Sequence, residues 1–584
     1  MRLWQVFASV SIITIHAARI TPPSNKHFLS QNHPSEPTEL STEISKATSD
    51  RIETLPGLNE DIVVDHHAGL ITLDSGVNDR LFYWHFNAYK SPEKAPLIIW
   101  LNGGPGCSSM EGLFYGISPF YLDKGEGIRT NPHSWLNTAN MLFLDQPVGT
   151  GMSSTHKNEH RVDEETLAKD FREFLIKFLK LHPEYLSLSS DKPAISRPIY
   201  IFGESHAGRY IPQFSQHILE QNLDTKDIHI SLHGVGIGNG WVHPIIQYDY
   251  SEFAHGIGLI TLGQVRELKA IYAKCIADLN ISFYSRTCLD NIDTIIDSVS
   301  NSRVNRLNQY DVRMFMESSQ EYPAGLNHMT EYLNRLDVRK ALHANTDQSF
   351  RYNQCSSRVH TSLLKFDGVS SLKNVDFLLE NGVQVLFYNG QWDMVCNPYN
   401  TEKLLLFLEW KGSQEFHGSE KFTWMVKGQQ EPAGYAQHGG NLTYLVVAGA
   451  GHMVTYNVPA VALDMVDRFI HGKGFADQKQ SVASIYTNSS HLASYQCPSV
   501  EDLQAVSALF HSGKSFATAL WIWIVILMTL LSAAISSIAT ASCMRSRISQ
   551  GLEHCVLLDQ DENELLKDQT VEVGAMAGDT KEPM

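Results

Sequence analysis

Several features that would place a chain in a common functional class are missing from this 584-residue sequence. It has no long basic run, and its 63 acidic residues outnumber 46 basic ones, so we expect no nucleic-acid partner. No cysteine–histidine spacing is typical of a metal site, no phosphate-binding loop occurs, and no internal repeat is present. We therefore expect no cofactor and no metal, and a chemistry carried by side chains.

Cysteine is scarce, with eight residues in the whole chain. Cys543 and Cys555 follow a long apolar segment and are expected in the cytosol, where thiols stay reduced and Cys543 is open to palmitoylation. The six others allow about 15 complete pairings, and the residues alone do not choose among them.

Two apolar segments nearly free of charge indicate the compartment. Residues 1–18 combine a short basic start, an apolar stretch and small residues, which predicts a secretory signal peptide. Residues 516–541 carry no charge and predict a transmembrane helix; a buried core helix is the alternative, but Arg545 and Arg547 just beyond favour the membrane. We expect a single-pass type I protein with a luminal body and an acidic cytosolic tail at 542–584.

Polar segments separate these parts. Residues 19–60 predict a flexible leader or propeptide, and the serine-rich residues 476–515 predict a luminal stalk. In the tail, Asp561, Leu565 and Leu566 resemble an acidic dileucine signal for sorting adaptors. The sequons at Asn280, Asn441 and Asn488 suit glycosylation in the lumen.

From 61 to 475 the chain alternates apolar runs with helical patterns, which predicts an α/β fold with a mostly parallel sheet covered on both faces. A helix is expected at 166–181, and a largely helical cap insertion at about 242–340. The expected strands are 97–101, 141–144, 199–202, 234–237, 383–388 and 444–447.

Residues 198–212 are the stretch around which the rest of the chain is arranged. A short β-branched and aromatic run leads to Gly203, which permits a sharp reversal, and a helix can start at Ala207. This pattern predicts a nucleophile elbow that presents Ser205 above the sheet edge. A buried strand followed by a turn of small residues is the alternative interpretation.

Three further turns after expected strands carry reactive groups. The glycine-rich residues 102–109 let backbone N–H groups face an oxyanion or a carboxylate. Asp393 and His452 follow two later strands; alone, the first is a plausible turn former and the second a plausible loop histidine. Together the order Ser205, Asp393, His452 is the one that α/β-hydrolases use.

These residues resemble a known family. The stretches 100–109, 145–151, 203–212, 238–240 and 451–453 are similar to the motif series of serine carboxypeptidases, the carboxypeptidase Y family, over residues of about 60–475. The resemblance implies an α/β-hydrolase fold. With the predicted signal, span and tail, the chain most resembles the membrane-bound fungal pheromone-processing carboxypeptidases of the late Golgi.

The resemblance implies roles for single residues. Ser205, His452 and Asp393 would form the catalytic triad, with Gly104 and His206 supplying the oxyanion N–H groups. Asn102, Gly103 and Glu204 would bind the substrate's terminal carboxylate. Because a glutamate donates to a carboxylate only when protonated, the pKa of Glu204 should be raised, and mildly acidic pH should favour activity. Packing beside the elbow, or capping the next helix, is the alternative for Glu204.

The sequence departs from the family pattern near the nucleophile. Gly116 stands where the family has a second glutamate, so the usual proton sharing with Glu204 is in doubt. Glu111 stands where basic-specific members carry an acid and is our candidate for attracting Lys or Arg; a solvated loop carboxylate is the alternative. His206 replaces a tyrosine, and Thr455 replaces a proline. Residues 390–393 differ from the usual run without changing the acid.

The resemblance also implies two disulfides, Cys107 with Cys355 and Cys275 with Cys288. Cys396 matches a free thiol near the substrate and, with Met453, is expected to line the side-chain subsite; Cys497 stays unassigned. The expected function is removal of C-terminal Lys and Arg from pro-protein or peptide ends after dibasic cleavage. A serine carboxypeptidase of broad or apolar specificity, an acyltransferase and an inactive luminal peptide receptor are the alternatives.

Overall fold

The computed structural model describes residues 50–476, except 59–61, 77, 124–126, 157–159, 188–192, 226, 301–304 and 318–319. The predicted signal peptide, most of the leader, nearly all of the stalk, the 516–541 span and the tail lie outside the described residues, as do Asn488, Cys497, Cys543 and Cys555. Within the described ranges, no helix has both the length and the apolar character needed to cross a bilayer.

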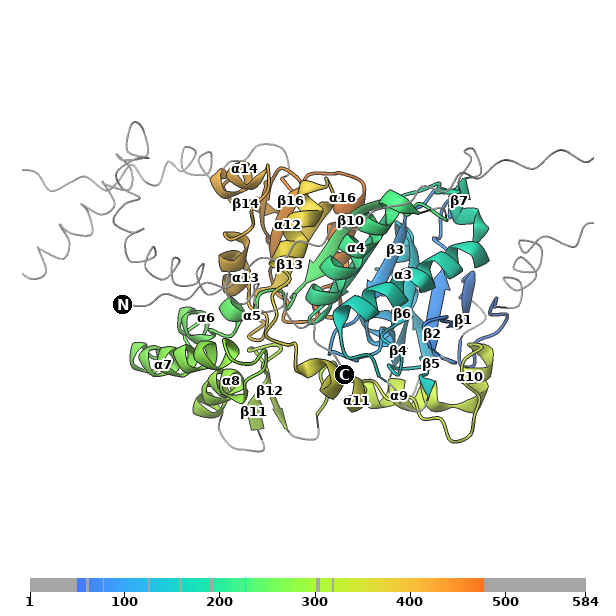
Figure 1. Cartoon of the computed structure of the whole chain (residues 1–584). Helices are drawn as coiled ribbons and strands as arrows, with labels where there is room; N and C mark the ends of the chain where they lie inside the picture. The colour runs from blue at the N-terminus through green and yellow to red at the C-terminus, as the bar shows by residue number, and fades with distance from the viewer. Residues whose placement is uncertain are drawn as a thin grey trace, which may run out of the picture.

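The centre of the fold is a sheet with ten strands among the described residues (Figure 1). Six neighbours, from β6 to β16 in the sheet order, run parallel, and antiparallel pairs extend the sheet at both edges. In order the strands are β1 (His66–Thr72), β2 (Arg80–Phe86), β6 (Asn140–Asp145), β3 (Leu97–Leu101), β9 (Ile199–Glu204), β10 (Leu232–Gly238), β13 (Gln384–Gly390), β16 (Leu442–Val447), β15 (Gly434–Gly439) and β14 (Phe422–Trp424).

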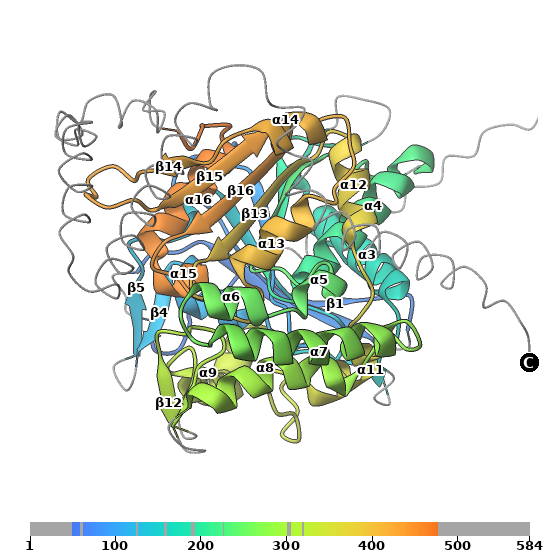
Figure 2. The ribbon, with the colours of Figure 1, turned by 90° about the vertical axis from the view of Figure 1, so that its left-hand side faces the viewer.

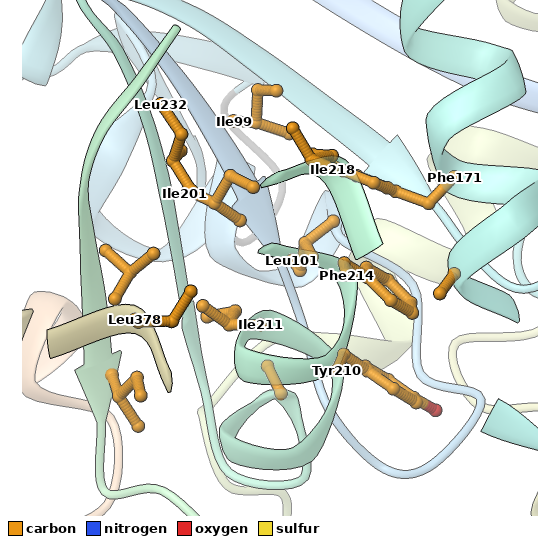
Figure 3. Packing of buried hydrophobic residues seen from close by; sticks show 14 of the residues in the cluster. Ile99, Leu101, Phe171, Ile201, Tyr210, Ile211, Phe214, Ile218, Leu232 and Leu378 are labelled. Carbon is orange, nitrogen blue, oxygen red and sulfur yellow. The ribbon is translucent and has the colours of Figure 1, made fainter. Parts of the chain in front are cut away.

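The sheet is buried on both faces because successive strand residues point to opposite sides. Ile99 and Leu101 of β3 enter one apolar cluster, and Ile98 and Trp100 enter the other. Helices α3 (Glu164–Leu181), α4 (Ala207–Asp224) and α12 (Leu372–Glu380) cover the first face, where Phe214 of α4 meets this cluster (Figure 3). Helices α15 (Val454–Asn457) and α16 (Pro459–Ile470) contribute to the second cluster.

A cap lies beyond one end of the sheet (Figures 1 and 2). The segment between β11 and β12 of the cap contacts the loop after β13: the Val312 N–H donates to the Trp392 carbonyl, and the Met394 N–H donates to the Gln309 carbonyl. The cap therefore covers the carboxyl ends of the parallel strands. The cap elements are α5 (Pro244–Gln247), α6 (Ser251–Gly256), α7 (Leu262–Leu279), α8 (Arg286–Val299), β11 (Asn305–Leu307), β12 (Phe315–Glu317), α9 (Leu326–Asn334) and α10 (Leu336–Ala341).

Short elements complete the described chain. They are α2 (Met110–Gly112), η1 (Leu113–Ile117), β4 (Phe120–Asp123), β5 (Gly127–Thr130), η2 (Trp135–Asn137), η4 (Pro183–Tyr185), β7 (Leu186–Ser187), β8 (Ala194–Ile195), α11 (Ser357–Leu364), α13 (Pro398–Leu405) and α14 (Ser413–Gly418).

All six strands expected from the sequence are present and parallel, with ends that differ from the expected bounds by at most two residues. The helix expected at 166–181 starts at Glu164, because Asp163 accepts the Thr166 N–H and caps it (2.8 Å). The cap insertion is largely helical, as expected, and also holds the β11–β12 hairpin.

Candidate active site

The turn between β9 and α4 presents Ser205 at the carboxyl end of the sheet. Ser205 has the left-handed φ of 62°, the strained backbone of a nucleophile elbow. The expected reversal at Gly203 is wrong: this glycine is the fifth residue of β9. A Cβ at 203 would lie 2.2 Å from the Leu101 carbonyl oxygen, so glycine is needed for the close approach of β3 and β9.

Asp393 and His452 form a hydrogen-bonded pair beyond β13 and β16. The His452 Nδ1 and Asp393 Oδ2 atoms are 2.7 Å apart, and the carboxylate is fully buried. Asn239, directly after β10, donates to the same Oδ2 from its side chain (2.8 Å), and the Cys396 N–H donates to it as well (3.1 Å). The acid is thereby fixed in the orientation that holds the imidazole.

The electrostatics of His452 suit a general base. Burial opposes protonation of the ring, but the charge of Asp393 and its hydrogen bond to the ring outweigh burial, so the pKa of His452 is raised above its usual 6.5. The hydrogen bonds of the described residues do not include one between the Ser205 hydroxyl and His452. Catalytic hydrogen bonds are often long before substrate binds and shorten in the complex.

Two backbone N–H groups beside Ser205 are free to bind an oxyanion. Neither the Gly104 nor the His206 N–H donates a hydrogen bond to another described residue. The glycine-rich loop touches the elbow, because a Cβ at Gly103 would lie 2.5 Å from the His206 nitrogen. Donors placed in advance at this position stabilise a developing negative charge.

Asn102 and Glu204 form a polar cradle next to the nucleophile. The Asn102 amide donates to Glu204 Oε1 (3.1 Å), and its oxygen accepts from the Trp100 indole (2.7 Å). Burial, assisted by Glu111 and Asp393, raises the pKa of Glu204 to about 8. Glu204 is thus protonated at neutral pH and able to donate. It does not cap α4, whose start has no side-chain cap.

Glu111 is not the solvated loop carboxylate of the alternative interpretation. It lies in α2, is buried, and accepts from the Gln354 side-chain amide (2.9 Å). Burial raises its pKa, while Gln354 and His452 oppose the rise. No lysine or arginine pairs with Glu111 among the described residues. Its electrostatic influence on both Glu204 and His452 places it within the site.

Gly116 leaves no room for the family's second glutamate. Its φ is 135°, inside the irregular η1 turn, and a Cβ there would lie 2.2 Å from the Thr455 carbonyl oxygen. A side chain at 116 would therefore displace helix α15, which follows His452. The carboxylates that raise the pKa of Glu204 here are Glu111 and, to a smaller extent, Asp393.

The remaining predicted residues fall around this centre or at the surface. Disulfides join Cys107 to Cys355 and Cys275 to Cys288, while Cys396 is buried and free; Met453 is buried next to His452. Among the described residues, one group of potential metal ligands lies close enough together to share an ion: Asp393, Cys396 and His452. Two of these three belong to the triad.

The two described sequons differ. Asn280 ends α7 and is exposed, so its glycosylation stays a prediction. The Asn441 amide nitrogen donates to the Leu379 and Val383 carbonyls (2.9 and 2.7 Å). A glycan replaces one of the two hydrogens on that nitrogen, so glycosylation at 441 would cost at least one of these bonds, and it stays a prediction.

Sequence reasoning missed residues that hold the site without reacting. Asn239 orients Asp393. The carbonyl of Tyr310, a cap residue, accepts a hydrogen bond from the backbone N–H of His452 (2.7 Å). Gln354 binds Glu111 from the residue before Cys355. For Asn239, the Gly-Asn-Gly run at 238–240 was a sequence motif that could have indicated its role. No motif in the sequence indicated a role for Gln354 or Tyr310.

The sheet, the elbow and the buried imidazole–carboxylate pair define the class of this protein: it is an α/β-hydrolase. The serine carboxypeptidase profile matches residues 56–472, and the chain belongs to that family of peptidases. It is 49% identical over 535 residues to the pheromone-processing carboxypeptidase KEX1 of Phytophthora infestans, covering 89% of each chain.

Two other relatives support the assignment. Serine carboxypeptidase S10 family member 2 of Dictyostelium discoideum is 35% identical over 79% of this chain and 83% of its own. The crystal structure of Kex1(delta)p, a prohormone-processing carboxypeptidase from Saccharomyces cerevisiae, is 26% identical, with a TM-score of 0.66 over 73% of this chain and 96% of that one. The enzyme class is thus a serine carboxypeptidase.

Proposed function

We propose that this carboxypeptidase removes C-terminal Lys and Arg from peptides in the late secretory pathway. Glu111 carries the proposal, because it is a buried carboxylate within the site that lacks a cationic partner among the described residues. Such a charge is costly to bury alone and is compensated when a cation binds. The chain's similarity to a pheromone-processing and a prohormone-processing carboxypeptidase supports this substrate class.

The mechanism assigns one task to each group. Ser205 attacks the last peptide carbonyl as His452 takes its proton, and Asp393 holds the ring and its positive charge. The Gly104 and His206 N–H groups bind the oxyanion. His452 then protonates the leaving amino acid, and water hydrolyses the acyl-enzyme by the same steps. Asn102, the Gly103 N–H and protonated Glu204 bind the terminal carboxylate, which restricts cleavage to the chain end.

The predicted signal peptide and the 516–541 span support a type I protein of the late Golgi membrane, whose tail at Asp561, Leu565 and Leu566 would meet sorting adaptors. Both segments are properties of the sequence, and the location is proposed on that basis together with the relatives' names.

The test compares peptides that differ only in their last residue. Glu111→Gln keeps the Gln354 contact and removes the charge, so kcat/KM for terminal Lys or Arg should fall about 10-fold to 100-fold while terminal Leu changes little. An equal fall in kcat/KM for every terminal residue would show that Glu111 does not determine specificity and instead belongs with Glu204 to the cradle for the terminal carboxylate.

A further inference from the structure

The motif at residues 145–151 takes no part in the chemistry of Ser205, yet it closes around a buried acid. Asp145 is the last residue of β6, and its side chain is fully buried. The chain turns back on this side chain, since the Met152 N–H donates to Asp145 Oδ2 (2.8 Å). A Cβ at Gly151 would lie 2.1 Å from the same oxygen, so glycine is needed for the turn to close this tightly.

The other oxygen of Asp145 binds the segment that follows the glycine-rich loop. Oδ1 accepts from the Ser108 hydroxyl (2.6 Å) and from the Ser109 N–H (2.9 Å). The Ser108 oxygen in turn accepts from the Met110 N–H (3.2 Å), at the start of α2. Burial raises the pKa of Asp145 to about 6, so at neutral pH it is a carboxylate. Hydrogen bonds to a charged acceptor are stronger than those between neutral groups, so this segment is firmly held.

The same segment sets the orientation of Asn102. The Ser109 hydroxyl oxygen accepts from the Asn102 N–H (3.1 Å). Asn102 Oδ1 accepts from the Gly112 N–H of α2 (3.2 Å) and from the Trp100 indole (2.7 Å). Because two donors fix the oxygen end of the amide, its NH2 end faces Glu204 (3.1 Å) and can donate to a substrate carboxylate.

We propose that Asp145 is a positioning residue for the peptide's free end: it holds residues 108–112, and this segment turns the NH2 group of Asn102 towards the terminal carboxylate. The inference rests on the proposed cradle of Asn102 and Glu204. Asp145 does not touch the substrate in this mechanism and acts only through Asn102.

The oxyanion donors are held by other contacts. Gly103 packs against the elbow, since a Cβ there would lie 2.5 Å from the His206 nitrogen. The Cys107 N–H donates to the Gly103 carbonyl (3.1 Å), and Cys107 is fixed by its disulfide. We therefore expect loss of the Asp145 contacts to weaken binding of the free chain end while Ser205 keeps its reactivity.

The test measures kcat and KM for a free-ended peptide with the full-length protein and with Asp145→Asn, Ser108→Ala and Asn102→Ala. We expect KM to rise about tenfold in all three variants with kcat within about threefold, because the lost interaction binds substrate and transition state alike. The rate of fluorophosphonate labelling at Ser205 needs no chain-end carboxylate and should stay within about twofold.

Ser153→Ala is the matched control. Ser153 is a buried serine that donates to the Asp145 backbone carbonyl (2.6 Å), and no hydrogen bond joins it to residues 108–112 in the described structure. Its loss should leave KM unchanged. Combining Asp145→Asn with Asn102→Ala should raise KM little beyond Asn102→Ala alone, because both changes remove the same contact.

The outcomes separate this inference from the proposed function. An unchanged KM in Asn102→Ala overturns the cradle itself, and the role of Asp145 with it. A raised KM in Asn102→Ala with an unchanged KM in Asp145→Asn and Ser108→Ala overturns the inference alone. A rise in KM that is matched by an equal fall in the labelling rate shows that Asp145 only supports the fold, and also overturns it. If Asp145→Asn does not fold, Ser108→Ala decides the question.

Discussion

Glu204 sets the pH range in which a peptide's free carboxyl end is bound. Its pKa of about 8 keeps it protonated through neutral pH, so the activity window reaches further into alkaline pH than the mildly acidic preference expected from the sequence. At low pH the limit comes from His452, whose raised pKa means that the base is lost by protonation as the pH falls.

The alkaline limit gives a prediction for Glu204→Gln. A glutamine donates at any pH, whereas Glu204 loses its proton above about pH 8 and then repels the substrate carboxylate. Wild-type kcat/KM for a free-ended peptide should fall about tenfold from pH 7 to pH 9, and the variant should show no such fall. Peptides with an amidated end are the matched control, and an equal alkaline fall in both enzymes would contradict this role.

Residue-scale prediction from the sequence succeeded where the reacting groups belong to short continuous motifs. The motifs after β3, β9, β13 and β16 each carry their own turn, so Ser205, Asp393 and His452 could be named from local patterns. The partners Gln354 and Asp367 could not be named in this way. Gln354 meets the Glu111 carboxylate, and Asp367 meets the His206 imidazole, each across more than 150 residues of chain. Such contacts depend on tertiary packing and leave no local pattern.

At the scale of elements, the β1–β2 edge contains a histidine cluster that the sequence did not predict. The rings of His67, His85 and His182 have centroids 5.1–6.0 Å apart, and each ring leaves one buried nitrogen without a hydrogen bond to any described residue. His66 in the same strand accepts from the Trp84 indole (3.2 Å). Burial, with help from His67, lowers the pKa of His66 to about 4.

The lowered pKa of His66 predicts that acid destabilises the fold. The unfolded chain binds a proton on His66 near its usual pKa of 6.5, whereas the folded chain does so only near 4, so stability is full above about pH 6.5 and falls as the pH drops towards 4. Between pH 7.5 and 5, this residue should lower the free energy of unfolding by about 1–2 kcal/mol.

Urea denaturation of wild type and His66→Gln at both pH values measures this contribution. Glutamine keeps an acceptor for Trp84 but does not titrate, so the variant should lose about 1–2 kcal/mol less than wild type between the two conditions. Identical pH dependence in the two proteins would show that His66 is not protonated on unfolding.

At the scale of the whole molecule, the central sheet was predictable and its edges were not. The parallel strands are buried on both faces and read as continuous apolar runs, while β1 and β15 mix buried and exposed positions and contain histidine, glycine or glutamine. The cap was recognised as a break in the strand–helix alternation. The hydrogen bond from the His452 N–H to the Tyr310 carbonyl of the cap could be found only in the folded structure.

Three separate strand ends form one reactive site at Ser205. Labelling of the full-length protein with a fluorophosphonate, followed by mass spectrometry of the modified peptide, tests this arrangement most directly. We expect a single adduct on Ser205, labelling slowed at least 100-fold in His452→Ala, and none in Ser205→Ala. An intact fold that takes up no label at Ser205, as an inactive peptide receptor would, contradicts the account.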